Sequence, residues 1–222
     1  LRETGAAVTC GHLRVRSDER DFVFEQNPAP DLVSGIFRGS VWTHPHTFLY
    51  RAAAVEKCRW EPEVPYHQDT AFAIQVTTQG LPEAVTERPV GLYRDHQLRS
   101  ISNDVKSVAP VGDQVGLRVQ LIEQGIERLR ERGLIEPHHR EAAAHGMWTW
   151  GHIIAAYDLN QFSDVHGKIE AIRPGFQPTR KNGILSGLDA LFGARTTEYL
   201  TYPVRRVKRT LTTMGGFVPN VV

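Results

Sequence analysis

The sequence predicts an α/β domain followed by an α-helical extension, because its pattern changes near residue 105. Before that point, short segments with strand-like alternation are separated by prolines and glycines and surround one clear helix. Beyond it, apolar residues recur at helical spacing, beginning with Val115, Val119, Ile122, Ile126 and Leu129. We therefore expect an α/β part at residues 1–104 and a helical extension at residues 105–222.

The first part contains three longer segments with strand character and one helix. The strand segments are residues 6–16, 41–50 and 85–93, with a shorter candidate at residues 22–24. Pro45 restricts the second segment to a sheet edge or a bend, because proline has no backbone N–H to donate. The helix is expected at Asp69–Gln79, with Asp69 at or near its N-cap and Gly80 ending it.

Helical periodicity in the second part predicts two long helices and two shorter ones. Asp113 is placed to cap the first long helix, and Gly133 is placed to end it. The second long helix opens at Pro137 and runs to about Leu159. The shorter helices are expected at residues 185–192 and 197–211.

Composition narrows the functional classes that fit the chain. The 222 residues are 41% hydrophobic and carry a net charge of +1, so nothing attracts the whole chain to nucleic acid. Cys10 and Cys58 are far apart and form no CxxC pair, which favours a reducing compartment. No apolar run is long enough to span a bilayer. We expect a cytoplasmic protein, at most located at the inner face of a membrane, and a chain that begins inside a domain.

An ordered set of motifs lies between residues 44 and 102. A strand ends at Tyr50–Arg51, an Arg59–Trp60 pair follows, and then Gln68–Asp69 opens the helix that Gly80 closes. After the next strand comes a loop with Tyr93, Arg94, His96, Ser100 and Ser102. This order and spacing resembles the second half of family-2 glycosyltransferases with the GT-A fold. The resemblance covers roughly residues 1–104 and implies the latter half of a GT-A sheet, with the donor-binding half upstream of Leu1.

The resemblance implies a catalytic role for Asp69, at the position of the acidic Glu-Asp motif. An inverting sugar transfer needs a carboxylate that takes the proton of the acceptor hydroxyl while its oxygen attacks the anomeric carbon. A helix N-terminus favours the ionised form of such a group. Without the motif order, Asp69 would be interpreted as a plain helix cap. Gln68 departs from the usual Glu of the motif and lacks its charge.

The resemblance also implies a donor site in the loop after the last strand. Arg94, Arg99, Ser100 and Ser102 could donate hydrogen bonds to the diphosphate of a nucleotide-sugar donor. His96 could be a ligand of the Mg²⁺ or Mn²⁺ ion that many GT-A enzymes hold, or could contact the diphosphate itself. The Asp-x-Asp pair that completes such a metal site would lie upstream of residue 1. A solvated polar loop is the alternative interpretation.

Residues expected on the acceptor side precede the base. They are His44, His46, Trp60, Tyr66, His67 and Gln68. The acceptor would be a hydroxyl on a glycan, a polymer or a lipid-linked sugar. His44 and His46 would share one face of a strand, which also occurs in metal sites, and a metal-dependent hydrolase is a weaker reading. A non-catalytic, glycosyltransferase-like module that binds a glycan or a partner is the main alternative function.

Other histidines and the basic C-terminal segment complete the sequence predictions. His138, His139, His145 and His152 lie in the extension, where we expect solvated side chains without acidic partners and assign no role. Residues 202–211 combine four cations with Val204, Val207 and Leu211, which would share one face of a helix begun at Pro203. Such a segment could bind an anionic membrane surface or pack on the extension.

Overall fold

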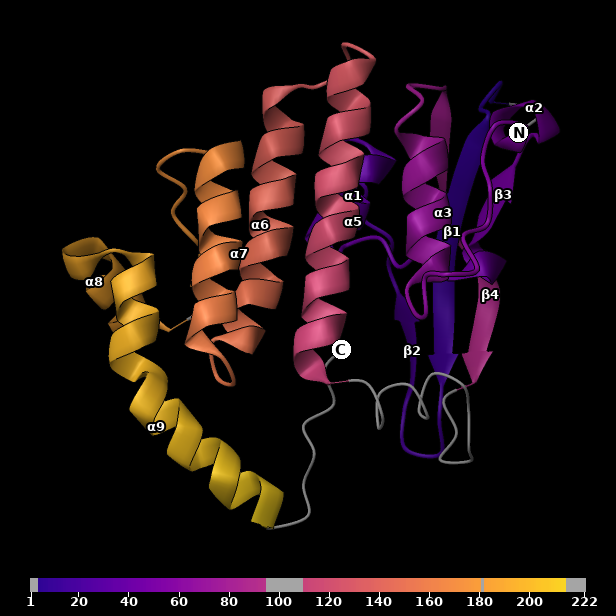
Figure 1. The fold of residues 1–222 in the computed structure, drawn as a ribbon. Coiled ribbons are helices and arrows are strands. Elements are labelled where there is room, and N and C mark those ends of the chain that lie inside the picture. The colour runs from indigo at the N-terminus through magenta and orange to yellow at the C-terminus, as the bar shows by residue number, and fades with distance from the viewer. Residues whose placement is uncertain (1–3, 95–109, 181, 215–222) are drawn as a thin grey trace.

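The computed structural model describes residues 4–94, 110–180 and 182–214, with the side chains of the last helix described as far as residue 207. A small sheet stands at one side of the molecule, and helices are stacked outward from it (Figure 1). The coarse expectation, an α/β part followed by helices, is confirmed.

Strand β1, Val8–Arg16, is the centre of a four-stranded mixed sheet. Strand β4, Glu83–Arg94, pairs with β1 in parallel along the whole length of β1. Strands β2, Asp21–Phe24, and β3, Phe48–Tyr50, pair with β1 in the antiparallel sense. They use different halves of β1, so they lie end to end along the edge opposite β4.

Four short helical elements connect these strands. They are α1, Leu32–Arg38; the 3₁₀ helix η1, Pro45–Thr47; α2, Ala52–Val55; and α3, Gln68–Thr77. The strand expected at residues 41–50 is wrong over most of its length. Pro45 opens η1 instead, because its fixed φ suits the first position of a helix, and only Phe48–Tyr50 is extended.

The direction of α3 determines toward which end of the sheet its N-terminus points. Because α3 leads through a short connection into the start of β4, its N-terminus lies toward the carboxyl ends of β1 and β4 (Figure 1). In open α/β sheets, ligands bind outside the carboxyl ends of the parallel strands. The N-terminus of α3 is therefore where the fold favours a functional site.

Five helices lie in the described part of the extension. They are α5, Val111–Glu131; α6, Pro137–Ile154; α7, Leu159–Ile172; α8, Gly183–Phe192; and α9, Ala194–Met214. The second long helix ends five residues earlier than expected, and α7 was not predicted. The last helix begins before Pro203, which lies inside it, rather than at that proline.

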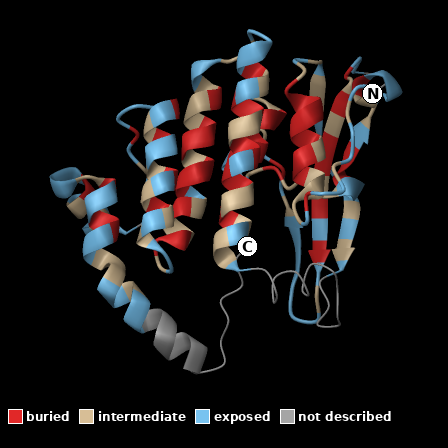
Figure 2. Ribbon diagram, viewed as in Figure 1, coloured by how far each residue is buried: buried red, intermediate tan, exposed pale blue. Residues whose placement is uncertain are grey.

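The apolar core is continuous from the sheet into the extension. Buried side chains follow one another from Val8 in β1 through Ile74 in α3 and Ile122 in α5 to Ile169 in α7. In Figure 2 the buried parts, in red, are found both on the sheet and on the helices stacked beside it. The extension therefore packs on the α/β part as a layer of the same core.

Two further findings concern membrane spans and cysteines in the described part of the chain. No described helix is both long and apolar enough to cross a bilayer. Cys10 and Cys58 are free thiols, as their sequence spacing indicated.

Candidate active site

Asp69 lies in the first turn of α3, two positions after the N-cap residue His67. Its side chain is partly buried, and its carboxylate accepts no hydrogen bond from the residues that the structure describes. Burial raises the pKa of Asp69 above its ordinary value, while the nearby His46 lowers it by a smaller amount. Asp69 does not cap its helix, so the carboxylate is free to accept a proton.

His67, the N-cap of α3, has a backbone conformation that histidine rarely adopts. Its φ is 62°, in the left-handed region, and its side chain makes no capping hydrogen bond. The ring lies edge-on to Tyr66 and to Trp150 of α6, with centroids 6.0 and 5.9 Å away. Burial, and to a lesser extent the Arg118 guanidinium, lowers the pKa of His67 to about 4. This ring is therefore neutral at neutral pH and held by aromatic contacts.

His44 and His46 flank Pro45 in the turn η1, close to Asp69. Their rings stack with centroids 4.8 Å apart, and their Nδ1 atoms are 3.1 Å apart. The Thr43 and Thr70 hydroxyls share a buried hydrogen bond of 2.7 Å, which ties this turn to the first turn of α3. The two histidine side chains thus lie side by side as expected, but because of a turn and not because they share one face of a strand.

Aromatic residues extend the histidine pair toward the end of β4. Tyr93 lies 5.3 Å, centroid to centroid, from both Trp42 and His44. Arg94, predicted to bind the donor, is exposed at the last position of β4. Polar and aromatic side chains therefore gather near the carboxyl end of β4 and the start of α3.

Trp60 and Gln68, both predicted on the acceptor side, have different surroundings. Trp60 is 47% exposed and lies against Phe72, one turn after Asp69, with ring centroids 5.6 Å apart. The Gln68 amide donates a 2.8 Å hydrogen bond to the Val64 carbonyl. Gln68 thus holds the loop that precedes Asp69, whereas Trp60 has an exposed ring beside α3.

Several predicted residues lie outside the described part of the chain. They are His96, Arg99, Ser100 and Ser102. The diphosphate loop and the metal role of His96 therefore stay predictions.

His44 and His46 form no complete metal site with the residues that the structure describes. No third His, Cys, Asp or Glu ligand atom of the described residues lies close enough to complete a metal-binding group with them. The hydrolase reading therefore gains no support from the described residues.

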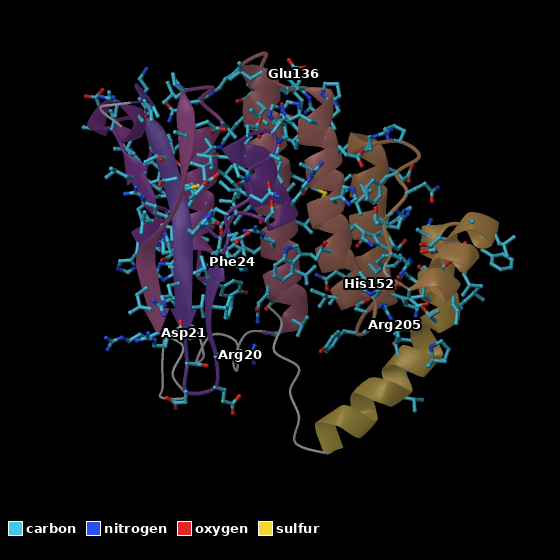
Figure 3. All side chains as sticks on the ribbon, turned by 180° about the vertical axis from the view of Figure 1, so that it is seen from behind. Arg20, Asp21, Phe24, Glu136, His152 and Arg205 are labelled. Carbon is cyan, nitrogen blue, oxygen red and sulfur yellow. The ribbon has the colours of Figure 1, made fainter. Side chains whose placement is uncertain are left out.

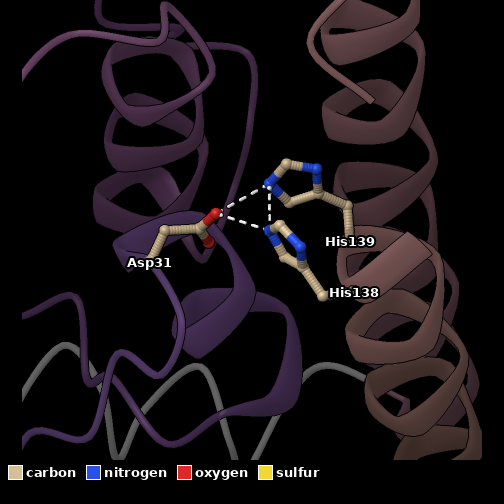
Figure 4. Close-up of side chains that lie close together, drawn as sticks. All are labelled: Asp31, His138 and His139. Atoms are coloured by element: carbon tan, nitrogen blue, oxygen red, sulfur yellow. Dashed lines mark hydrogen bonds and ion pairs between the residues drawn. The ribbon is translucent and has the colours of Figure 1, made fainter. Parts of the chain in front are cut away.

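A second polar cluster joins Asp31, at the N-cap of α1, to the start of α6 (Figure 4). The Asp31 Oδ2 atom lies 2.9 Å from His138 Nε2 and 2.8 Å from His139 Nε2, and the two nitrogens are 3.1 Å apart. Three convergent ligand atoms of these types are typical of transition-metal sites. This group lies beside the start of β4, where Glu83 accepts a hydrogen bond from the Leu32 backbone N–H.

The hydrogen bonds of His139 show how this cluster is held together in the structure. His139 Nδ1 accepts a 3.0 Å hydrogen bond from the Glu136 backbone N–H, so the proton of the neutral ring is on Nε2. Burial raises the pKa of Asp31, but hydrogen bonds from His139, Ser34 and His138 outweigh it and hold that pKa well below its usual range. An ionised Asp31 only accepts, so both Nε2 atoms donate to it in this structure. The cluster is a clamp between α1 and α6.

The clamp corrects the expectation that the extension histidines have no acidic partners. His138 and His139 pair with Asp31, His145 lies 3.2 Å from Glu141, and His152 lies 2.9 Å from Glu198. The partners of His138, His139 and His152 are distant in sequence, so local pattern could not reveal them. The Glu141–His145 pair is four residues apart on one helix, and that spacing was a usable signal.

Sequence reasoning also missed Trp150 and Thr70 near Asp69. Trp150 lies on another helix, and its ring packs against the His67 ring. Thr70 follows Asp69 directly and has no predicted role, although its hydroxyl is hydrogen-bonded to Thr43, which precedes His44.

Comparison of the chain with protein-family models, curated proteins and solved structures gave no match.

Proposed function

We propose that this chain is the acceptor-side part of an inverting, GT-A type glycosyltransferase, with Asp69 as the catalytic base. The observation that carries the proposal is the Asp69 carboxylate, which accepts no hydrogen bond from the described residues and lies at the helix N-terminus that points toward the carboxyl ends of two parallel strands. The ordered motifs from Tyr50 to Ser102, which resemble family-2 glycosyltransferases, supply the reaction class.

Asp69 would act by a single displacement. The acceptor hydroxyl oxygen attacks the anomeric carbon of the donor sugar while an Asp69 oxygen takes the hydroxyl proton. The bond from that carbon to the nucleoside diphosphate breaks, and the diphosphate leaves with the electron pair. A pKa raised by burial makes Asp69 a stronger base than an exposed aspartate.

The surroundings of Asp69 support an acceptor that carries hydroxyl groups. His44 and His46 offer ring nitrogens, and Trp42 and Tyr93 provide aromatic faces beside them. Sugar rings pack on aromatic faces and exchange hydrogen bonds with imidazoles and hydroxyls. We infer a glycan, a polymer or a lipid-linked sugar as the acceptor class, with His67 and Tyr66 shaping its entrance.

A divalent ion, Mg²⁺ or Mn²⁺, belongs to the proposal only through the resemblance. The 222 residues contain no Asp-x-Asp pair, and His96 lies outside the described residues. The described side chains therefore give no ligand set for this ion, and no step is assigned to it. Arg94, the one described member of the predicted donor loop, is placed to approach a diphosphate from the end of β4.

One observation favours the alternative of a non-catalytic binding module. The Gln68 amide is engaged with the Val64 carbonyl, and Gln68 carries no charge where the family usually has Glu. Such a module would keep the acceptor site and bind glycans without turnover. Asp69, which has no competing hydrogen bond among the described residues, favours catalysis over this alternative.

The proposal is tested with the natural full-length protein and a panel of UDP-, GDP- and dTDP-sugars, with Mg²⁺ or Mn²⁺ present. We expect one donor to release its nucleoside diphosphate only when a glycan or lipid-linked acceptor is present. NMR of the product should show an anomeric configuration opposite to that of the donor. Glycan binding without release from any donor would establish the binding module instead, and a retained configuration would exclude Asp69 as a single-displacement base.

A further inference from the structure

Exposed apolar side chains gather on the last two described helices. They are Ile184, Leu191 and Phe192 of α8, and Leu200, Val204 and Val207 of α9, which we call the α8–α9 apolar surface. Ile184 and Leu191 are each 76% exposed, and Val204 is 72% exposed. Single exposed apolar residues are ordinary, but a group of large ones on adjoining helices marks an interaction surface.

A buried ionic network prevents α9 from turning this surface inward. Glu198 is fully buried and accepts hydrogen bonds from Arg180, at 2.7 Å, and from Arg205. His152 Nδ1, on α6, lies 2.9 Å from the Glu198 carboxylate. Figure 3 shows His152 and Arg205 side by side where α9 meets the earlier helices.

The network fixes the rotation of α9 about its own axis. Glu198, Thr201 and Arg205 lie on the side of the helix that faces the protein. At 100° per residue, the stripe of Leu200, Val204 and Val207 is rotated from that side by about 120°. Turning the stripe toward the core would expose the network and break its ion pairs, so the stripe faces away from the protein.

Charge is concentrated on the same helix. Residues 194–214 contain five cations and one carboxylate, a net charge of +4, whereas the whole chain carries +1. The single carboxylate is Glu198, which is buried and paired. The Arg205 guanidinium is partly used by this network; the other cations in the sequence of α9 are Arg195, Arg206, Lys208 and Arg209.

We propose that the α8–α9 apolar surface docks on an anionic lipid bilayer, with α9 lying in the interface as a basic amphipathic helix. Apolar insertion together with cationic attraction is the recognised requirement for such binding. A second copy of the chain is the less suitable occupant, because a symmetric contact would bring two basic helices together. The docking would be peripheral, since no described helix is suited to cross the bilayer.

The position of α9 relates this docking to the acceptor. Helix α9 lies on the side of the molecule opposite the sheet and runs down to the level at which β1 and β4 end (Figure 1). Docking through α9 would hold the chain at the membrane surface, which favours a lipid-linked acceptor over a soluble glycan. This acceptor class rests on the proposed function, whereas the docking itself does not.

Vesicle co-sedimentation of the full chain tests the docking. We expect binding to phosphatidylcholine vesicles that contain phosphatidylserine, weaker binding to phosphatidylcholine alone, and loss of binding as salt is added. Leu200→Asn should weaken binding about tenfold or more. Leu49→Asn is the matched control, because Leu49 is 57% exposed on β3 and Leu200 is 56% exposed on α9.

A second pair of variants tests the charge. Changing Arg206, Lys208 and Arg209 to Gln should lower binding to anionic vesicles about 100-fold, at roughly 1 kcal/mol for each cation. Changing Arg20, Lys57 and Arg88 to Gln removes the same residue types from exposed positions elsewhere and should have a much smaller effect. Arg205 is left unchanged because it belongs to the buried network.

Three outcomes would overturn the docking. Equal recovery in the supernatant with anionic and neutral vesicles at low salt is the first, and equal loss of binding by Leu49→Asn and Leu200→Asn is the second. The third is a stable dimer by light scattering that Leu200→Asn dissociates, since this would assign the surface to a second copy. Vesicle binding by a protein without transferase activity would refute the proposed function and leave the docking intact.

Discussion

His67 and Asp69 are two residues apart, yet their side chains have opposite environments. The His67 ring is enclosed by aromatic neighbours, and burial lowers its pKa to about 4. The Asp69 carboxylate is partly exposed, accepts no hydrogen bond from the described residues and has a raised pKa. Because His67 stays neutral, it adds no positive charge that would lower the basicity of Asp69. The unusual backbone of His67 is the kind of strain that accumulates at functional sites.

A pH-dependent prediction concerns Glu83, whose Oε1 accepts a 2.6 Å hydrogen bond from the Leu32 backbone N–H. Burial, and then the charge of Asp31, raises the pKa of Glu83 from 4.5 to about 7. Between these pH values the folded chain holds a proton that the unfolded chain has lost, so the free energy of unfolding falls as pH rises. Glu83→Gln stays neutral and keeps the acceptor oxygen. At pH 8 it should therefore be more stable than the natural chain by about 1–3 kcal/mol.

Urea unfolding at pH 4.5 and pH 8 measures this effect. The gain from Glu83→Gln should be present at pH 8 and small at pH 4.5, where the natural carboxyl is protonated in the folded state. Glu87→Gln, at an exposed position of the same strand, is the matched control and should have little effect at either pH. A gain of equal size at both pH values would show that Glu83 is not buried as a charge.

Helices α1 and α6 cross at close range around Phe37. The Phe37 ring packs where a Cβ on Gly125 of α5 would lie, and the Phe37 carbonyl oxygen lies where a Cβ on Gly146 of α6 would lie. The obstacle at Gly146 is a backbone atom, so a rotamer change cannot relieve it. The two glycines therefore set how closely the extension packs on the α/β part.

Gly146→Ala should destabilise the chain by about 1–3 kcal/mol or more, because α1 and α6 would have to separate. Gly167→Ala on α7 is the matched control, since a Cβ there meets nothing within 4 Å. That change should stabilise the chain by up to about 1 kcal/mol through helix propensity. The free energies of unfolding in urea check both values. A neutral Gly146→Ala would mean that the two helices do not cross in this way.

Elements with a long apolar period could be predicted from the sequence. Helix α5 repeats apolar residues over 21 positions, so its existence and its end near Gly133 were predicted correctly. The predicted cap was wrong, because Pro110 is the N-cap and Asp113 lies inside the first turn. Helix α1 has only seven residues directly after a proline-rich segment, which is too short for a periodic signal. The strand predicted around Pro45 failed because one proline outweighed the aromatic composition of its neighbours.

At the scale of the whole molecule, only those parts of the candidate site that lie close together in the sequence could be predicted. Asp69 and the histidine pair could be named from motif order, because they lie within one segment of the chain. The support of His67 by Trp150, and the pairing of Asp31 with His139 108 residues away, depend on how α6 packs against the first part. No local pattern encodes that packing, so those contacts could only come from the structure.

The most direct test of the account is the transferase rate of Asp69→Asn in the natural full-length protein. Asn cannot take the acceptor proton, so kcat should fall by about 10²–10⁴-fold with little change in donor KM. The matched control is Asp113→Asn, which removes an exposed carboxylate from the first turn of α5 and should keep near-normal turnover. For the natural protein, kcat should rise with pH through a pKa above the ordinary aspartate value of 3.8, and this rise should be absent in Asp69→Asn. Near-normal turnover by Asp69→Asn, with its pH dependence unchanged, would contradict the assignment of Asp69 as the base.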